Sequence, residues 1–374
     1  MVTVIRHISG RVTQHMFSLP NFRRFSCLML TACLSVSSGE SAAADQCRAA
    51  PALSKGLNVL GSPTFWAGKD NGMYRAVDMD AMASAGFDHV RINAMPFDSM
   101  DSGGTIDPKW LQRLDMAIEG ASSAGLAVII DLHEHVFCAR DASECERKTL
   151  LFWTEISARY QDRPSTVFFE ILNEPHGALD DSRWNKLLAS ALQVIRKRDT
   201  CRQVIIGPAS SNDLRKLNEL RLPQADRRLV VTFHYYIPFN FTHQGAAWTK
   251  HRYPPGVSWS AATQMPAIIR DFETVSRWSR LNDRPILLGE FGVLNTTDVN
   301  ERAEWINSII CLAREAGIGW SYWNFNGNSF GVFERNTKSW VPEVKAALTG
   351  PQSSTSCPDH DIDGPSRVEG SPPG

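Results

Sequence analysis

Short apolar runs alternate with longer amphipathic segments along the chain from residue 55 onward. The runs are rich in Val, Ile and Phe and are apolar almost without interruption, which is typical of parallel strands buried on both faces. They predict eight strands, over Gly56–Leu60, His89–Asn93, Ala127–His133, Thr166–Asn173, Gln203–Gly207, Leu229–Tyr235, Pro285–Glu290 and Gly319–Trp323.

Helical patterns separate these runs. Asp107 and Pro108 predict the N-cap and the first residue of a helix that continues over Lys109–Ser123 and that Gly125 ends. Further helices are predicted over Glu146–Tyr160, Ala261–Arg280 and Val299–Ala316, the last of them ending at Gly317.

Short strands that alternate with helices over about 300 residues indicate a parallel α/β fold. Eight repeats favour a closed (β/α)8 TIM barrel in a single domain over residues 45–349. An open, doubly wound sheet is the alternative, but it usually carries a glycine-rich phosphate loop after its first strand. The glycines of Gly56–Gly61 are spaced too widely for one. Residues 350–374 are rich in Ser, Pro and Asp, which predicts a disordered tail.

The first 44 residues resemble an export signal. Arg23 and Arg24 form a basic region, the apolar run Phe25–Val36 is too short to span a bilayer, and Ala42–Ala44 offers a cleavage site. The predicted location is therefore extracellular or periplasmic. The true start could be Met1 or Met16. The alternative is a lipid anchor, because the residues before Cys33 have the form of a bacterial lipobox.

Composition narrows the range of functions. The formal net charge of −1 gives no indication of a nucleic-acid partner. Loss of residues 1–44 would leave six of the eight cysteines, an even number that permits disulfides in an exported protein. Six cysteines allow about 15 pairings. The short separation favours Cys138–Cys145, and buried free thiols are the alternative.

Seven of the eight predicted strands end in polar or aromatic residues suited to binding or catalysis. In such a barrel the active site lies at the carboxyl ends of the strands, so these side chains are expected to meet. They are Asn58, Arg91, Asn93, His133, His135, Asn173, Glu174, His234, Tyr236, Glu290 and Trp323.

Two carboxylates stand out within this set. Glu174 and Glu290 each end an apolar strand, where burying a charge is costly. The fourth and seventh strands lie on opposite sides of a barrel, so the two side chains can face each other across its mouth. A facing pair of carboxylates is the minimum requirement for glycoside hydrolysis, in which one protonates the leaving oxygen and the other is ionised.

Several motifs give this pattern a family resemblance. Asn173-Glu174-Pro175, Gly289-Glu290-Phe291-Gly292, Asp131-Leu132-His133 and His234-Tyr235-Tyr236 resemble glycoside hydrolase family 5. The segment Phe241–Ala246, followed by Trp248, resembles the cellulase branch of that family, which includes endoglucanases with some mannan activity. The resemblance covers roughly residues 53 to 349 and implies a retaining endo-glycosidase, which the predicted export signal would make a secreted one.

The resemblance also implies a role for each matching residue. Glu290 would be the nucleophile and Glu174 the acid/base. Arg91 and Tyr236 would contact Glu290, and His234 would orient the acid/base region. Asn173 would bind the 2-hydroxyl of the attacked sugar, His133 would line its subsite, and Trp323 would stack under it. Lower-ranked sugar contacts are Asn58, His135, Trp66, Trp248 and Trp259, while Glu170 is expected to serve a polar core layer.

The expected partner is a polysaccharide, with cellulose-type β-1,4-glucan first, mixed-linkage glucan second and mannan third. No cofactor is expected, and a monomer is the default. One alternative is a metal-dependent barrel hydrolase that uses His133 and His135, since a His-x-His pair can bind metal. Another is a carbohydrate-binding protein without turnover.

Overall fold

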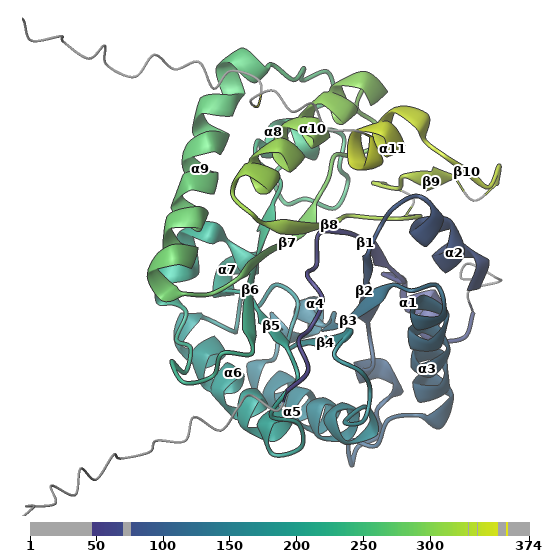
Figure 1. Ribbon diagram of the computed structural model, residues 1–374, viewed down its shortest axis with the longest axis vertical. Coiled ribbons are helices and arrows are strands. Elements are labelled where there is room, and N and C mark those ends of the chain that lie inside the picture. Colours follow the sequence, from purple (N-terminus) through teal and green to yellow (C-terminus); the bar gives the residue numbers. More distant parts are fainter. Residues whose placement is uncertain (1–46, 70–75, 328, 335, 351–356, 358–374) are drawn as a thin grey trace, which may run out of the picture. The chain divides into compact units, whose positions relative to one another are not determined.

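The computed structural model describes residues 47–69, 76–327, 329–334, 336–350 and 357, which all belong to one unit that begins at Cys47. Within these residues, eight parallel strands close into a barrel in chain order (Figure 1). This confirms the predicted (β/α)8 architecture. The strands are β1 (Lys55–Val59), β2 (His89–Ala94), β3 (Ala127–Leu132), β4 (Val167–Glu170), β5 (Val204–Ile206), β6 (Leu229–Tyr235), β7 (Ile286–Phe291) and β8 (Gly319–Tyr322).

Helices connect successive strands on the outside of the barrel (Figure 1). The main ones are α2 (Ala76–Ser84), α3 (Pro108–Ser123), α5 (Ala142–Arg159), α6 (Asp181–Arg196), α9 (Ala261–Asn282), α10 (Val299–Glu315) and α11 (Pro342–Thr349). Shorter elements lie between them: α1 (Pro63–Trp66), η1 (Phe97–Ser99), α4 (His135–Cys138), α7 (Ala209–Asn212), η2 (Leu214–Glu219), α8 (Phe239–Thr242) and the hairpin of β9 (Phe333–Glu334) with β10 (Ser339–Trp340). None of the described helices is both long and apolar enough to cross a membrane.

The predicted helix signals act as expected, with small shifts in the boundaries. The Asp107 carboxylate accepts a hydrogen bond from the Lys109 backbone N–H, and Gly125 follows α3 with a φ of +80°. Helix α5 begins earlier than predicted because Asp141 caps it through the Glu144 N–H. The predicted strand Thr166–Asn173 is regular only as far as Glu170, because its neighbour β5 has three residues.

The inside of the barrel divides into an apolar and a polar part. A small apolar cluster, separate from the main core between strands and helices, fills the amino-terminal part. It consists of Ala127, Ile129, Phe168, Ile205 and Leu287. Two residues further along the strands the inward side chains become polar, as with Asp131 after Ile129 and Glu170 after Phe168. The polar residues of the site therefore stand on an apolar floor.

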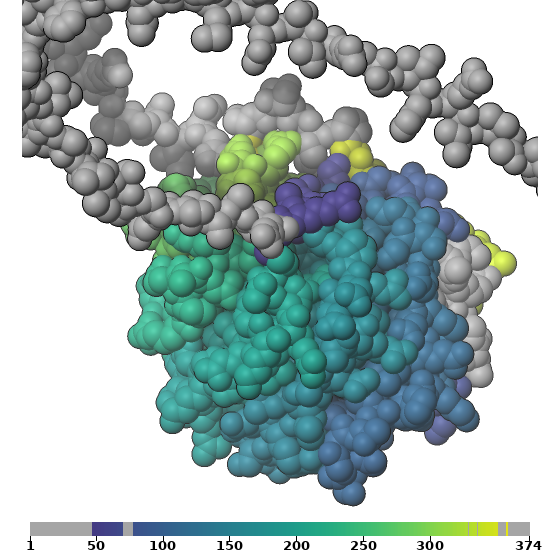
Figure 2. Space-filling model, turned by 60° about the horizontal axis from the view of Figure 1, so that its bottom comes forward, coloured from purple at the N-terminus to yellow at the C-terminus, as the bar shows by residue number. Residues whose placement is uncertain are grey.

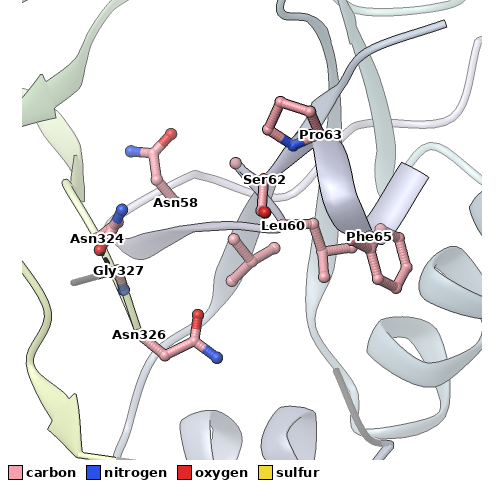
Figure 3. A pocket seen from close by; sticks show the side chains of 10 residues that line it. Asn58, Leu60, Ser62, Pro63, Phe65, Asn324, Asn326 and Gly327 are labelled. Atoms are coloured by element: carbon pink, nitrogen blue, oxygen red, sulfur yellow. Dashed lines mark hydrogen bonds between the residues drawn. The ribbon is translucent and has the colours of Figure 1, made fainter. Parts of the chain in front are cut away.

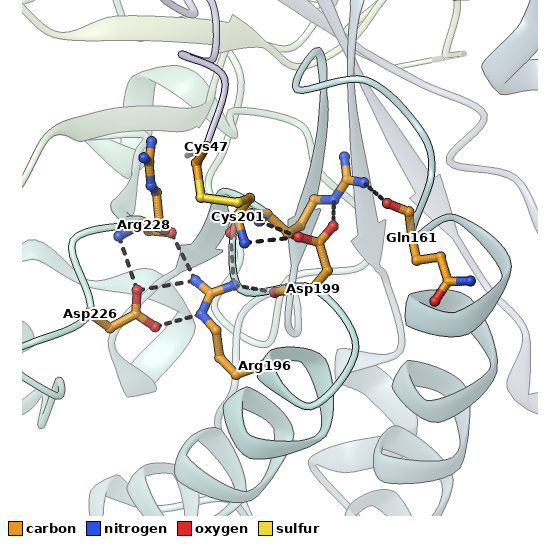
Figure 4. The surroundings of a disulfide bond; sticks show 8 residues. Cys47, Gln161, Arg196, Asp199, Cys201, Asp226 and Arg228 are labelled. Carbon is orange, nitrogen blue, oxygen red and sulfur yellow. Dashed lines mark hydrogen bonds and ion pairs between the residues drawn. A yellow bond between two sulfur atoms is a disulfide. The ribbon is translucent and has the colours of Figure 1, made fainter. Parts of the chain in front are cut away.

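Disulfides tie peripheral segments to this barrel. The predicted Cys138–Cys145 bond is present and joins α4 to α5. Cys47 is bonded to Cys201, ahead of β5, beside the ion pairs of Arg196 with Asp226 and of Arg202 with Asp199 (Figure 4). On the face in Figure 2, the purple residues that follow Cys47 lie against the teal middle of the chain, where the Ser165 hydroxyl donates to the Ala49 carbonyl.

The third disulfide joins Cys311 of α10 to Cys357, which is buried. It ties one point of the region predicted as a disordered tail to the barrel. The rest of that region beyond Gly350, the predicted export signal and Cys33 lie outside the described residues.

We expect the disulfides to differ in their effect on stability. Replacing both cysteines of Cys47–Cys201, which are 154 residues apart, should lower the free energy of unfolding by about 5 kcal/mol, against about 2.5 kcal/mol for Cys138–Cys145, 7 residues apart, since a longer loop loses more entropy when closed. Denaturant midpoints of the two double Cys→Ala variants measure this. Equal losses would contradict the loop-entropy explanation.

Candidate active site

A buried arginine lies at the centre of the polar part of the barrel. Arg91, on β2, is fully buried and donates two hydrogen bonds to Glu170, at 2.7 and 2.8 Å. It also donates to Glu290 at 2.7 Å, to Asn58 at 2.8 Å and to Asn173 at 2.9 Å. These partners come from β1, from β7, and from β4 with the segment after it, so one side chain links its own strand β2 to three others.

Charge balance keeps this arginine ionised. Burial acts to lower the pKa of Arg91, but the carboxylates of Asp131, Glu170 and Glu290 raise it well above its ordinary value. Burial raises the pKa values of Asp131 and Glu170, and Arg91 opposes that shift. Glu170 therefore serves the polar layer inside the barrel, as its place on the strand face predicts.

Glu290 and Glu174 face each other above this layer. The Glu290 carboxylate accepts hydrogen bonds from Arg91 and, at 3.0 Å, from the Tyr236 hydroxyl. An oxygen of the Glu174 carboxyl group lies 2.8 Å from His234 Nδ1, at hydrogen-bond distance. The two glutamates and His234 each offer an atom within 4.8 Å of the others.

Burial raises the pKa of both glutamates, that of Glu290 to about 7. The charge of Arg91 opposes this shift at both glutamates. Glu290 has a cationic donor at hydrogen-bond distance and Glu174 has none, so the negative charge of the pair is better stabilised on Glu290. The pKa of Tyr236 is raised well above its ordinary value by burial and by Glu290, which keeps the hydroxyl protonated as a donor.

Both glutamates line an open cavity of about 410 Å3. Most of the residues expected at the site line the same cavity, namely His133, His135, Asn173, Tyr236, Trp248 and Trp323. The rings of His133 and Trp323 are nearly parallel, with centroids 5.5 Å apart. Trp248 is 59% exposed at the rim, near Phe330.

A second cavity, of about 210 Å3, lies near the end of β1 (Figure 3). It lies between the segment that follows β1, with Leu60 and Ser62, and the segment that follows β8, with Asn324 and Asn326 (Figure 3). Gly61, Asn324 and Gly327 line both cavities, so the two cavities adjoin each other.

Two tryptophans expected at the site lie elsewhere. Trp66 is 2% exposed, stacks on Trp110 and donates its indole N–H to the carbonyls of Leu60 and Asn93. Trp259 is buried against Phe241. The prediction that these two tryptophans are exposed platforms for sugar is therefore wrong. Their sequence neighbours resemble a loop, but their rings pack in the apolar core.

Other residues of the site were not singled out from the sequence. His243, Ser329 and Phe330 line the cavity. Of these three, only His243 lies in a motif recognised in the sequence, the segment Phe241–Ala246. Asp131 accepts hydrogen bonds from His133 and Asn93. Asn212, after β5, donates to His234. The sequence Ser210-Ser211-Asn212 resembles an ordinary loop, so no sequence signal identifies Asn212 as part of the site.

The barrel and its facing pair of glutamates, one buried and one partly exposed, together define the class of a glycoside hydrolase, an enzyme that cleaves the bond between sugar units. Comparison with known proteins gives the family. Residues 50–329 match the family model described as Cellulase (glycosyl hydrolase family 5). The chain belongs to this family.

Individual relatives agree with this assignment. The chain is 30% identical over 253 residues to Endoglucanase H of Acetivibrio thermocellus, a match that covers 66% of this chain but only 27% of that longer protein. It is 26% identical over 307 residues to Endoglucanase C of the same organism, covering 71% of this chain and 88% of that protein.

Solved structures are similar as well. Structures of Cel5A from Thermotoga maritima in complex with cellobiose and with mannotriose are both 34% identical to this chain. Their TM-scores are 0.75 and 0.76, and each match covers 79% of this chain and 97% of the other.

We expect Arg91→Met to lower the free energy of unfolding by about 3 to 5 kcal/mol, because it leaves buried carboxylates without their cation. The loss should shrink as the pH falls, since protonation of Asp131 and Glu170 removes the uncompensated charge. Denaturant unfolding at several pH values measures both effects.

A matched control for this variant is Arg147→Met, which removes a partly exposed ion pair with Glu144 at the surface of α5. It should leave the denaturant midpoint nearly unchanged. An equal loss in the two variants would show that Arg91 is no more important than a surface charge.

Proposed function

We propose that this enzyme is a secreted, monomeric endo-glycosidase that cleaves cellulose-type β-1,4-glucan with retention of configuration. Glu290 is the nucleophile and Glu174 the acid/base. The observation that carries the proposal is the approach of the two carboxylates, with an oxygen of each within 4.8 Å of the other. Retaining enzymes hold these groups about 5 Å apart, whereas inverting enzymes need about 6.5 to 9.5 Å to admit a water.

In the first step, Glu290 attacks the anomeric carbon while Glu174 gives its proton to the glycosidic oxygen as that bond breaks. In the second step, Glu174 takes a proton from water, which attacks the glycosyl-enzyme and frees Glu290. The donors from Arg91 and Tyr236 support an ionised nucleophile, and the raised pKa of Glu174 supports a protonated acid.

Residues around the two glutamates would hold the sugar. Asn173 would contact the 2-hydroxyl of the attacked unit, and His133 would line its subsite. Trp323 offers an aromatic face for the C–H groups of a pyranose. Trp248 at the rim and the adjoining cavity toward β1 provide room for further sugar units, which favours cleavage within a chain.

Glucan is the first choice of substrate because the relatives are named endoglucanases. Mixed-linkage glucan follows it. Mannan is the alternative that the similar Thermotoga maritima structure with mannotriose favours. Export is supported by the three disulfides, which persist in oxidising compartments.

The proposed reaction uses no metal or cofactor. His135 fits the metal-dependent alternative poorly, because its Nδ1 accepts from Asn173 and its hydrogen is then on Nε2, which leaves no nitrogen lone pair for a metal. Among the described residues, neither histidine belongs to a group of three or more closely spaced ligand atoms.

Glu290→Gln should reduce the release of reducing sugar from carboxymethyl cellulose by at least about 1000-fold, because the amide cannot form the glycosyl-enzyme. Chelator should leave the wild type unaffected. Glu155→Gln, at an exposed position of α5, is the matched control. If the wild type is active on glucomannan but not on carboxymethyl cellulose, mannan replaces glucan as the proposed substrate. Full activity of Glu290→Gln would refute the assigned nucleophile.

Tyr236→Phe should move the acid limb of the pH profile of kcat/KM upward by about one pH unit. The lost hydrogen bond stabilises the charged form of Glu290, so its pKa rises further and the ionised nucleophile appears only at higher pH. Tyr235→Phe is a close control, because this hydroxyl donates to Asp271, outside the cavity. An unmoved acid limb in Tyr236→Phe would contradict this role for the tyrosine.

A further inference from the structure

The turn after β5 has an unusual backbone. Ser210, Ser211 and Asn212 are successive non-glycine residues with φ of 60°, 63° and 55°, in the left-handed region. Such a conformation costs about 1 kcal/mol or more for each residue, and Asn tolerates it best of the three. Gly207 leaves the space that the turn needs, because a Cβ there would lie 2.1 Å from Asn212 Oδ1. The surrounding structure must hold the turn in place.

The turn contacts the surroundings of Glu174 in two ways. The Ser211 backbone N–H donates to the carbonyl of Pro175, the residue next to Glu174, at 3.2 Å. The fully buried Asn212 donates from Nδ2 to His234 Nε2 at 3.1 Å, and His234 Nδ1 lies 2.8 Å from Glu174 Oε1. The turn therefore supports both the backbone and the carboxyl group of Glu174.

The hydrogen bonds of His234 define which nitrogen carries its proton. Nδ1 faces two carboxylates, Glu174 at 2.8 Å and Glu290 at 3.6 Å, so it carries a hydrogen and donates. Burial lowers the pKa of His234, which favours the neutral ring. A neutral ring with a hydrogen on Nδ1 has a lone pair on Nε2 and needs a donor there. The amide nitrogen of Asn212 is that donor.

We propose that Asn212 is a positioning residue that holds His234 with its hydrogen on Nδ1, and thereby keeps the proton of Glu174 available to the leaving group. The proposal rests on the proposed role of Glu174 as acid. With the hydrogen on Nε2 instead, the Nδ1 lone pair of His234 would accept the Glu174 proton. That proton would then not reach the glycosidic oxygen as the bond to the sugar breaks.

The test reverses the polarity of the Asn212 side chain. Asn212→Asp keeps the shape and tolerates the left-handed backbone, but a carboxylate only accepts hydrogen bonds. It would draw a hydrogen onto His234 Nε2. We expect kcat/KM for phenyl β-cellobioside, whose poor leaving group needs a proton, to fall about 10-fold or more. The leaving group of dinitrophenyl β-cellobioside departs without being protonated, so kcat/KM for this substrate should change by less than about 3-fold.

Three further variants complete the experiment. Asn212→Gly deletes the donor and allows the same backbone conformation, so it should lose activity on phenyl β-cellobioside in the same selective way. This variant provides the test if Asn212→Asp does not fold. Ser210→Gly, at an exposed left-handed position of the same turn, should leave both substrates unaffected. Glu174→Ala should show the largest selective loss on phenyl β-cellobioside.

The outcomes separate the two proposals. Equal losses on both cellobiosides in the Asn212 variants, or no loss on either, overturn the positioning role. A Glu174→Ala variant without selective loss overturns the assignment of Glu174 as acid, whatever the Asn212 variants do. Selective loss in both kinds of variant supports both proposals.

Discussion

The bidentate contact between Arg91 and Glu170 is the constraint on which the site depends. A guanidinium buried in a barrel is tolerated only if every N–H finds an acceptor and its charge is balanced. Glu170 supplies two of those acceptors and fixes the plane of the group. The remaining N–H groups then point to Asn58, Asn173 and Glu290, which brings the first, fourth and seventh strands into a defined relation.

The buried polar layer around Arg91 lies next to an apolar layer in the amino-terminal part of the barrel. Ile129, Phe168 and Leu287 exclude water from the amino-terminal part, and the loss of water there lowers the local dielectric around the polar residues above. The same desolvation raises the pKa values of the carboxyls in this layer, including the two that face the cavity. The apolar floor therefore contributes to the protonation state of the site that lies above it.

The sequence predicts the parts of this structure that repeat along the chain or follow local rules. The eight apolar runs indicate a barrel, and the positions of Glu174 and Glu290 at strand ends indicate where they meet. Local patterns fail where distant contacts decide. Trp66 looks like a loop residue but is buried against Trp110, which lies 44 residues further along the chain on α3. No motif surrounds Asn212 in the sequence. Its contact with His234 depends on a left-handed turn that the residues Ser210, Ser211 and Asn212 do not favour by themselves.

The directions of the hydrogen bonds around the cavity follow from a few charged groups. Arg91 can only donate, so the Asn173 atom that faces it is the oxygen, and the Asn173 amide nitrogen must donate to His135 Nδ1. His135 is therefore neutral with its hydrogen on Nε2, in agreement with a pKa lowered by burial to about 3. Donors and acceptors are thus oriented before any substrate arrives. Such an arrangement stabilises developing charge without the cost of reorganising dipoles during the reaction.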